Sequence, residues 1–556
     1  MLSPAMAQQL PSDAELRESQ QRADQDAQRR QDRERAQRER MPEVVLPRPQ
    51  SPVDDDDGRP DLPCFPIRRL ALKGDDAQFT QLIPALQALQ PGPEPMCLGA
   101  RGINRVMQQL QNELVAHGYV TTRVLAEPQD LKTGTLTLTV LAGRVRAIKR
   151  EGEGSERATL WNALPTGPGR ILDLRDIEQG IENLKRVPSA EADIQITPAD
   201  LPGESDLLVR WQQGSPFRAS LSVDDSGSDA TGKLQGNLSL SLDHWWTLND
   251  LAYVSFNHDL SQPGYTAQGT RGRSAGYSVP WGYALLAVSV GRSSYQQTVP
   301  SVAGQAPNLY SGSSHHGEAK LSWLLARGAR SKTTVSLTGW ARSSRNVIND
   351  VEVEVQRRRT GGWELGLEQR LHLGAATLDL DLAGRHGTGL RQALPAPEEA
   401  RGTGTSRMSL GTANAQLTWP FSVEQQNLRW STTWRAQWNH SPLVAQDHFV
   451  IGSRYSVRGF TGASSLAGEH GWLLRNDLAF ALGDSGAELY FGGDYGQVGG
   501  PAVDAQPGYR LAGAVIGLRG SFKRLSAEVF TGIPVVMPLG FNTPSHAGGF
   551  SLSLSF

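Results

Sequence analysis

The chain has 556 residues, and its 55 Lys and Arg nearly balance 57 Asp and Glu, which gives a formal net charge of −2 at pH 7. This balance gives no electrostatic reason to expect nucleic acid or an anionic membrane surface as a partner. The mean hydropathy is −0.39 and no long apolar run occurs, which excludes a transmembrane helix. A membrane β-barrel is still compatible, because only alternate residues of its strands face lipid. The length exceeds one ordinary domain, so we expect several modules.

The first residues resemble the end of a secretory signal peptide. Ala-Met-Ala at 5–7 stands directly ahead of Gln8, a pattern typical of signal-peptidase cleavage. We interpret residues 1–7 as a signal-peptide remnant, and a chance run of small residues is the alternative. In an exported chain, a single pair of cysteines, Cys64 and Cys97, favours a disulfide over a redox or metal site. This cross-link would restrict the unfolded chain by roughly 3 to 4 kcal/mol.

Residues 8–40 are expected to form one long helix that is polar on every side. Ser12 and Glu15 make a capping box, and several acidic residues precede a basic residue by four positions, the order that stabilises a helix. A helix of about 28 residues would be about 42 Å long, enough to cross a membrane. Such a helix either lines a water-filled cavity or remains a solvated, partly disordered arm.

Residues 41–63 are rich in Pro and Asp and show no periodicity. They predict an extended linker that lets the preceding helix move relative to the rest of the chain. The acidic run of residues 54–57 could bind calcium, but a solvated linker is the simpler interpretation.

Two copies of a β-α-α-β-β pattern occupy residues 64–143 and 144–214. In the first copy, GINRVMQQLQNELVAHGY predicts an amphipathic helix that ends at Gly118, and GTLTLTVLAG predicts a strand. In the second copy, RATLWNAL (157–164) predicts a helix, and Asp173 is expected to cap another. The tandem pattern indicates an internal repeat of about 75 residues. Exposed sheet edges on such modules suit β-augmentation, in which a foreign segment joins the sheet as a strand.

Residues 215–556 show alternation of apolar and polar residues over many segments. The end of the chain is the clearest case, where Phe550, Leu552, Leu554 and Phe556 alternate with serines. This period of two, with Asp and Arg on the second face, fits a barrel with lipid outside and water inside, whereas a soluble β-sandwich would turn its leucines inward. We favour the membrane barrel, and the length of the segment predicts roughly 16 strands, give or take two.

Several tryptophans fall near the ends of the expected strands. A membrane barrel needs such aromatic residues for its interfacial girdles. The residues that we assign to the girdles are Trp245, Trp246, Trp281, Trp323, Trp340 and Trp363.

Together these features resemble the two-partner secretion transporters, the TpsB family of outer-membrane translocases. The features in common are two tandem modules, a polar N-terminal helix on a Pro-rich linker, a barrel that ends in Phe556 and the stretch VRGF. The match covers almost the whole chain. The stretch from Cys64 through CLGARGINRVMQQLQNELVAHGYVTTRVLAEPQDLKTGTLTLTVLAGRV is similar to the haemolysin-transporter and contact-dependent-inhibition branch (ShlB-like and CdiB-like), where a cysteine pair occurs in the first module.

The resemblance implies a role for each part of the chain. Residues 64–143 and 144–214 would be two α+β POTRA modules in the periplasm, and residues 215–556 a barrel of 16 antiparallel strands in the outer membrane. Residues 8–40 would be a plug helix that lies in the lumen at rest. Its balanced charge suits a wet lumen of mixed charge, because no unpaired ion is buried and the weak contacts let the helix leave.

The resemblance also places the VRGF segment at the tip of a long extracellular loop that folds back into the barrel. The residues of this segment are Val457, Arg458, Gly459 and Phe460. Its arginine would meet an aspartate on the inner wall of the barrel, and the glycine would permit the tight turn. An exposed turn with a solvated arginine is the alternative.

The wall motif of the family has the form F-x-G-x-D, and here YFGGD supplies Tyr490, Gly492 and Asp494, with Tyr in place of Phe. The three residues share one parity along a strand and therefore face the same side. Gly492 would leave room for the loop to approach. A charge-assisted contact between Arg458 and Asp494 would be worth about 1.5 to 3 kcal/mol.

The resemblance implies export of one very large protein across the bacterial outer membrane, without ATP and without covalent chemistry. The partner would be a TpsA-type exoprotein, such as a haemolysin, an adhesin or a contact-dependent inhibition toxin, which binds unfolded to the POTRA modules and then threads the vacated pore. Contacts with outer-membrane lipid, lipopolysaccharide and periplasmic chaperones are expected. The transporter is expected to act as a monomer and to bind no nucleic acid.

Three other classes of protein are alternatives. An outer-membrane insertase shares the barrel and the VRGF-type loop, but it usually has more POTRA modules and no plug helix. A solute porin has no reason to carry two periplasmic modules. An enzyme is the weakest alternative, because His117, His315 and His316 show no ligand spacing and no phosphate-binding loop occurs, so no catalytic, cofactor or metal residues are expected.

Overall fold

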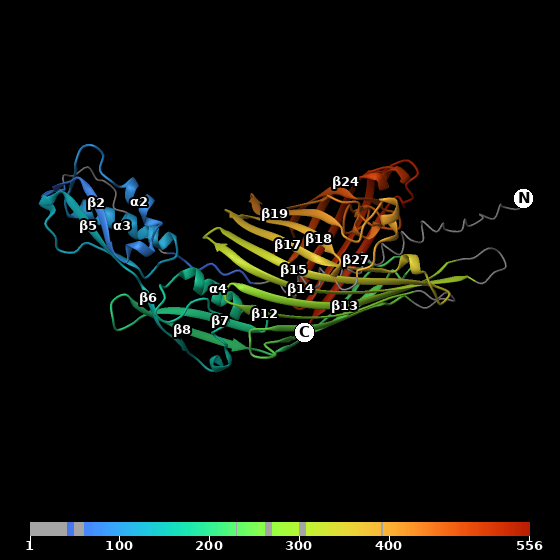
Figure 1. Ribbon diagram of the computed structural model, residues 1–556, viewed down its shortest axis with the longest axis horizontal. Coiled ribbons are helices and arrows are strands. Elements are labelled where there is room, and N and C mark those ends of the chain that lie inside the picture. Colours follow the sequence, from blue (N-terminus) through green and yellow to red (C-terminus); the bar gives the residue numbers. More distant parts are fainter. Residues whose placement is uncertain (1–41, 49–60, 229–230, 262–268, 300–306, 391–392) are drawn as a thin grey trace, which may run out of the picture.

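The computed structural model describes residues 42–48, 61–228, 231–261, 269–299, 307–390 and 393–556. Two small modules stand in a row at one end of a closed β-barrel, and the first module lies farther from the barrel than the second (Figure 1). Several expected features lie outside the described residues, so the structure does not bear on them. They are the signal-peptide remnant at 1–7, the helix at 8–40 with Ser12 and Glu15, and the acidic run at 54–57.

The first module packs two helices against a three-stranded sheet. Strand β5 is the central strand, parallel to β2 and antiparallel to β4. Alternate residues of β5, Leu136 and Leu138, are buried in one core with Leu110 and Leu114 of α3. The elements are β1 (Phe65–Ile67), β2 (Arg69–Gly74), η1 (Asp76–Gln78), α2 (Leu82–Ala88), β3 (Met96–Leu98), α3 (Ala100–Ala116), β4 (Arg123–Leu125), η2 (Leu131–Thr133) and β5 (Thr135–Leu141).

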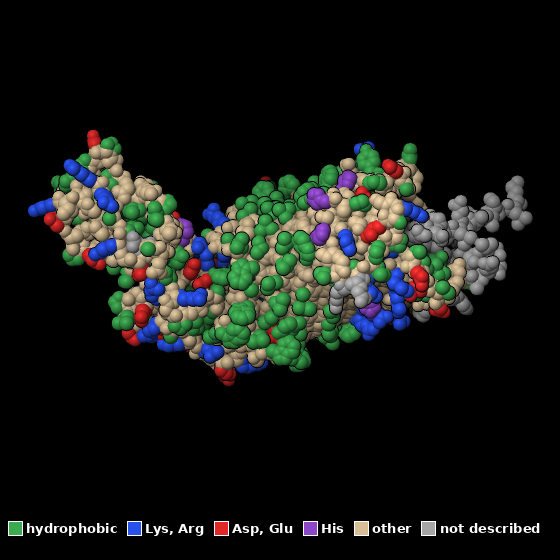
Figure 2. All heavy atoms as spheres, in the orientation of Figure 1, with side chains coloured by type: hydrophobic (Ala, Val, Ile, Leu, Met, Phe, Trp, Pro, Cys, Tyr) green, Lys and Arg blue, Asp and Glu red, His purple; other side chains and the backbone are tan. Residues whose placement is uncertain are grey.

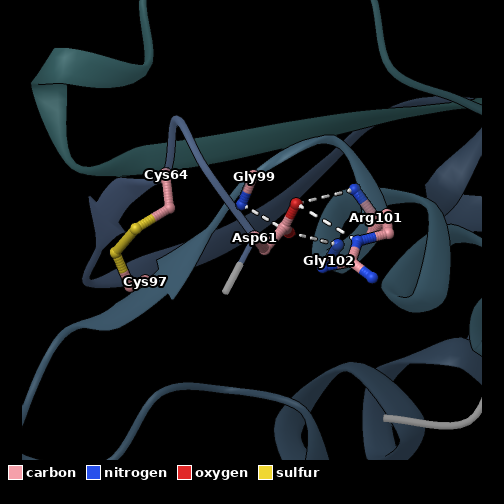
Figure 3. Close-up of a disulfide and its surroundings, with 6 residues drawn as sticks. All are labelled: Asp61, Cys64, Cys97, Gly99, Arg101 and Gly102. Atoms are coloured by element: carbon pink, nitrogen blue, oxygen red, sulfur yellow. Dashed lines mark hydrogen bonds and ion pairs between the residues drawn. A yellow bond between two sulfur atoms is a disulfide. The ribbon is translucent and has the colours of Figure 1, made fainter. Parts of the chain in front are cut away.

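A disulfide and a capped helix start fix the beginning of the first module. Cys64 and Cys97 are bonded, with their Cα atoms 5.4 Å apart, next to the β1–β3 pair (Figure 3). The carboxylate of Asp61 accepts the backbone N–H groups of Gly99 (2.8 Å) and Gly102 (2.7 Å) at the N-terminus of α3. The bond from Gly102 is the largest cause that lowers the pKa of Asp61 below its usual value. This carboxylate therefore satisfies N–H groups that a helix start leaves unpaired.

Replacement of both Cys64 and Cys97 by serine should destabilise the first module by about 3 kcal/mol, because the cross-link closes a long loop, with a sequence separation of 33 between the cysteines. Limited proteolysis of the full chain in detergent should then cut within the first module at lower protease concentration. The barrel should keep its heat-modifiable migration on gels, which is the folding control. Equal protease resistance of the two proteins would show that the disulfide adds nothing.

The second module contains one α-helix over a three-stranded sheet in the order β6-β8-β7. Helix α4 begins as expected, because the side chain of Asp173 accepts the backbone N–H of Arg175 at 2.9 Å. Its apolar residues Ile177, Ile181 and Leu184 lie in one core with β8. The elements are β6 (Arg144–Arg150), η3 (Ser155–Arg157), α4 (Leu174–Leu184), β7 (Ala190–Pro198) and β8 (Glu204–Gln213).

The helix predicted for residues 157–164 is wrong. This segment forms turns, because it is used to cover the barrel rather than to continue a helix. Its Asn162 side chain donates to the carbonyl groups of Leu248 (2.7 Å) and Pro280 (3.2 Å), which both belong to the end of the barrel next to the modules. Tertiary contacts of this kind override the local preference for helix.

The barrel is closed and antiparallel, as predicted. Strand β27 pairs with β9, with Leu552 opposite Val223. Strand β16 is a two-residue extension that pairs only with β15, so 16 strands form the wall in the described residues. The strands are β9 (Phe217–Asp224), β10 (Gln235–Asp243), β11 (Leu251–Asp259), β12 (Gly269–Trp281), β13 (Ala284–Val299), β14 (Asn308–Arg327), β15 (Ser331–Ile348), β16 (Val351–Glu352), β17 (Arg358–Leu373), β18 (Ala376–Thr388), β19 (Ser409–Val423), β20 (Gln426–Asn439), β23 (His470–Ala481), β24 (Ala487–Gly499), β25 (Arg510–Phe522), β26 (Leu525–Val536) and β27 (Ala547–Ser555).

The alternating pattern turns apolar side chains outward. Phe217 and Leu552 are exposed (71 % and 44 %), and Figure 2 shows the apolar side chains as a broad surface over the barrel strands. No helix in the described part of the chain has the length and apolar character needed to cross a membrane. The structure confirms the expected fold class, a 16-stranded antiparallel barrel preceded by two α+β modules.

Five of the six tryptophans assigned to the girdles are exposed on the surface, namely Trp245, Trp246, Trp281, Trp323 and Trp363. The assignment of Trp340 is wrong. Its position in β15 opposite Gly362 has the parity of the inner face, and its ring stacks under the guanidinium of Arg385, with 4.7 Å from the Cζ atom to the ring centroid. Proximity to a strand end therefore does not decide on which face a residue lies.

Candidate functional site

A long connection between β20 and β23 folds back against the inner wall of the barrel. It carries η7 (Ala445–Asp447) and a short hairpin of β21 (Phe449–Ile451) and β22 (Leu466–Gly468). The tip of this hairpin, residues 452–465, contains the VRGF segment. The hydroxyl of Ser456 accepts the backbone N–H of Gly452 at 3.0 Å and thereby holds the turn closed.

The structure brings Arg458 and Asp494 together. The guanidinium donates from Nε to Oδ2 (2.7 Å) and from Nη2 to Oδ1 (2.7 Å) of Asp494, and the backbone N–H of Arg458 also donates to Oδ2 (2.9 Å). Each of the two residues is only 4 % exposed. A bidentate, buried, charge-assisted pair of this kind fixes orientation as well as contributing energy. The tip of the loop is thus tied to strand β24.

A second carboxylate, that of Asp477, also binds Arg458, and the sequence analysis did not predict this contact. Nη2 of Arg458 also donates to Oδ1 of Asp477 on strand β23, at 2.6 Å. Asp477 lies opposite Gly492 in the β23–β24 pair. Nε of Arg475 stands 3.8 Å from Asp494. The alternation in residues 472–480 could have placed Asp477 on the inner face, but only the register between the strands puts it beside the wall motif.

The other two residues of the wall motif shape the surface that receives the loop. Tyr490 is 1 % exposed, and its hydroxyl donates to Glu528 at 2.8 Å. The guanidinium of Arg519 lies over its ring, with 4.6 Å from the Cζ atom to the ring centroid. A Cβ atom added to Gly492 would stand 2.6 Å from Nη2 of Arg458. Glycine is therefore required for the guanidinium to reach both carboxylates.

Apolar side chains seal the tip on either side of Arg458. Val457 and Phe460 are buried in one cluster with Leu473 of β23 and Leu511 of β25. Phe460 also meets the ring of Phe541 edge to face, with 5.7 Å between the centroids. Exclusion of water from this cluster strengthens the adjacent ionic contacts.

Gly459 satisfies two separate requirements of the motif. Its φ angle is +96°, a conformation in which a side chain is strained. An added Cβ atom would also stand 2.3 Å from the carbonyl oxygen of Ile533 on β26. The turn that presents Arg458 to the wall therefore depends on glycine at this position.

Tyr490→Phe should leave secretion nearly unchanged. The ring would keep its place under Arg519, and only the hydrogen bond to Glu528 would be lost, a change of about 1 kcal/mol. Secretion of the partner by cells that carry the variant measures the effect. A severe loss would mean that the hydroxyl, and not the shape of the wall, is required by the motif.

A second polar cluster joins the linker, the second module and the barrel, and no motif in the sequence points to it. Glu178 and Glu182 lie one turn apart on α4 and are 1 % and 0 % exposed. Arg327, at the end of β14, contacts Glu178 (3.1 Å from Nε to Oε2) and Glu182 (2.8 Å from Nη2 to Oε1). Lys332 at the start of β15 contacts the other oxygen of Glu182 at 2.7 Å.

The linker residues 42–48 complete this cluster. The backbone N–H groups of Val44 and Leu46 donate to Glu182 (3.0 Å) and Glu178 (2.9 Å), and the Val44 carbonyl accepts from Arg327 at 2.6 Å. Val44 and Leu46 also pack against the core of the second module. We call residues 42–48 together with Glu178, Glu182, Arg327 and Lys332 the linker clamp.

The clamp keeps the buried carboxylate of Glu182 charged. Burial alone would raise the pKa of Glu182, but the hydrogen bond from Arg327 and the charges of Arg327 and Lys332 outweigh it, and its pKa lies below the ordinary value of 4.5. The partners of this carboxylate come from three different parts of the chain: the linker, β14 and β15. Removal of one partner leaves an under-compensated buried charge, which is costly.

The predicted disulfide lies apart from the lumen. The disulfide of Cys64 and Cys97 belongs to the first module, as do His117 and its contacts. Within the residues that the structure describes, no group of three or more His, Cys, Asp or Glu could hold a metal ion.

Comparison with known proteins finds three family models that match successive parts of the chain. The model of the haemolysin secretion/activation proteins ShlB/FhaC/HecB matches residues 203–520. A ShlB-type POTRA model matches residues 65–143, and another POTRA model matches residues 144–198.

Individual relatives agree with the family models. The outer membrane transporter CdiB-2 of Burkholderia pseudomallei is 35% identical over 99% of this chain and 97% of its own length. The hemolysin transporter protein ShlB of Serratia marcescens is 25% identical over 78% of this chain and 76% of its own length. The solved structure of CdiB from Acinetobacter baumannii superimposes with a TM-score of 0.83 and 28% identity over 98% of this chain and 100% of that one. The chain belongs to the ShlB/FhaC/HecB family of outer-membrane transporters.

Proposed function

We propose that this chain is the transporter of a two-partner secretion system. It binds one large TpsA-type exoprotein, unfolded, through the periplasmic POTRA modules and moves it through the barrel to the cell surface, without ATP. The partner is a haemolysin, an adhesin or a contact-dependent inhibition toxin. The transporter works as a monomer, and periplasmic chaperones deliver the partner to it.

The observation that carries this proposal is the combination of open sheet edges with a closed barrel whose lumen receives a loop. Each module has two outer strands, β2 and β4 in the first and β6 and β7 in the second. An extended segment can add to such an edge through main-chain hydrogen bonds, which do not depend on its sequence. The second module lies against the barrel end, so a bound segment is held close to the pore.

The linker clamp connects the proposed plug helix to the second module and the barrel. If residues 8–40 form the plug helix, the clamped residues 42–48 limit how far that helix can travel. Release of the clamp lets it leave the lumen. The buried Arg458 pair holds the loop tip against the wall while the pore is vacated.

Expression of this chain together with the exoprotein encoded beside its gene tests the proposal. The exoprotein should reach the cell surface, as judged by antibody labelling of intact cells, and should stay in the periplasm when the transporter is absent. An insertase would behave differently, since its removal would lower the amounts of unrelated outer-membrane barrels. Normal surface delivery without the transporter would refute the proposal.

A further inference from the structure

The outer face of the barrel carries a row of arginines that transport does not explain. On strands β12 to β17, the residues whose parity matches the exposed apolar side chains face outward. Phe256 of β11 is 48 % exposed and pairs with Arg273, and Arg273 pairs with Arg292 of β13. Arg292 in turn pairs with His315 of β14. These residues therefore form one ladder across the outer face.

A second ladder runs directly beyond the first. Arg271 pairs with Ser294, Ser294 with Ser313, and Ser313 with Arg345. Nε of Arg345 donates to the Ser313 hydroxyl at 3.2 Å. The outward positions of β12, β13, β14, β15 and β17 contain no Asp or Glu. Figure 2 shows Lys and Arg side chains gathered over the far ends of β13 to β15, next to the apolar surface.

The height of the first ladder matches the edge of a membrane. Trp281 marks the periplasmic end of β12, because its ring meets Trp161 of the second module, with 5.8 Å between the centroids. Arg273 lies eight residues farther along the strand. At about 3.4 Å per residue and a tilt of about 40°, this distance is about 20 Å along the barrel axis. The apolar band of such barrels is about 25 Å tall, so the backbone of the first ladder lies about 5 Å inside its outer edge, and the long arginine side chains reach the headgroup level of the outer leaflet.

The charges of this row are not balanced within the described part of the protein. Arg271, Arg273 and Arg292 form no ion pair with a carboxylate of the described residues. Arg273 and Arg292 stand directly opposite each other, and like charges in that arrangement are unfavourable. The nearby carboxylate of Glu352 is already paired with Arg357 at 2.7 Å. An external anion would remove the repulsion, and guanidinium groups pair best with the planar oxygens of carboxylate and phosphate.

We propose that the outer face of β12 to β15 binds the phosphate groups of an anionic glycolipid in the outer leaflet, through Arg271, Arg273, Arg292 and Arg345. The continuous apolar surface below the arginines receives the acyl chains of the same molecule. The proposal rests on the outer-membrane location of the chain and not on the identity of the exported partner.

Native mass spectrometry of the full chain in neutral detergent tests the site, with bisphosphorylated lipid A and its dephosphorylated form as probes. The wild type should retain the phosphorylated probe preferentially. The double variant Arg273→Gln and Arg292→Gln should lose about tenfold or more in retention, since charged hydrogen bonds are removed. Arg510→Gln, an exposed arginine at the outer end of β25, is the matched control and should bind like the wild type. Heat-modifiable migration verifies that each variant is folded.

Three outcomes would overturn the proposal. One is equal retention of the phosphorylated and dephosphorylated probes by the wild type. Another is unchanged retention by the folded double variant. The third is displacement of the lipid by millimolar inorganic phosphate, which would show that the row takes a free anion and has no use for the acyl chains. The conservative variant Arg292→Lys should keep part of the retention, because it keeps the charge and loses only the planar fork.

Discussion

Arg458→Ala should reduce secretion of the partner at least tenfold, to about the level of cells without the transporter. The substitution removes the donor that satisfies Asp494 and Asp477 together, both in a buried site. Loss of one partner from a buried ion pair costs about 3 to 5 kcal/mol, more than about a hundredfold in the population of the docked loop. Secretion is measured as exoprotein at the surface of intact cells, relative to the amount of transporter in the outer membrane.

Two further measurements separate the role of this pair from a folding defect. Arg458→Lys keeps a charge but cannot bridge two carboxylates with a planar fork, so an intermediate level of secretion is expected. The barrel of each variant should still show heat-modifiable migration, because 16 strands close without the loop. Full secretion by Arg458→Ala would mean that the docked tip has no part in transport.

Arg327→Ala should open the linker clamp and raise the ionic conductance of the protein in planar bilayers. The substitution takes away the side chain that contacts Glu178, Glu182 and the Val44 carbonyl at once. The carboxylates would keep other partners, but each would lose a buried cation, a change of about 3 kcal/mol or more. The linker should detach and the proposed plug helix should leave the lumen more often.

A cysteine in place of Leu46 reports on the clamp directly, because both native cysteines are in the disulfide. Labelling of this cysteine by a maleimide should be slow in the otherwise wild-type protein and several-fold faster with Arg327→Ala. The exposed pair of Arg357 and Glu352 supplies the control, since Arg357→Ala should change neither labelling nor conductance. If Arg327→Ala leaves both readouts unchanged, the clamp does not restrain the linker.

The clamp also has an expected pH dependence. The pKa of Glu182 is lowered in the folded protein, so its contribution is fully present above the ordinary value of 4.5 and is lost as the pH falls through the lower, folded value. Wild-type conductance should therefore stay constant from neutral pH down to about pH 5, because the carboxylate of Glu182 keeps its charge over this range. Only stronger acidification should open the clamp through this carboxylate.

The sequence could predict the barrel because the period of two is a direct consequence of strand geometry. Phe550 and Leu552 face lipid for the same reason that the serines between them do not. The outward position predicted for Trp340 was wrong, because the prediction used its proximity to a strand end and not its parity along the strand. The incorrect helix prediction at residues 157–164 has another cause, since Asn162 donates to carbonyl groups at the end of the barrel, and a local sequence pattern does not contain these distant partners.

Only part of the site could be predicted from the sequence. Arg458 and Asp494 were named through a family resemblance, whereas Asp477 depends on the register of β23 against β24. The linker clamp and the outer arginine row need contacts or register across several strands. The near-neutral net charge gives no sign of the arginine row, because a balance of charges over 556 residues does not show how they are distributed on one face of the barrel.

Site-specific photo-crosslinking tests most directly whether the partner passes through the barrel. Gln416 and Leu417 are neighbours on β19 and face opposite sides, since Gln416 pairs with Asp379 of the inner face and Leu417 with Leu378 of the outer face. A photoreactive residue at position 416 should cross-link to the exoprotein while it is being secreted, and one at position 417 should not. Efficient secretion with no cross-link from the lumen, or equal cross-links from both faces, would contradict transport through this pore.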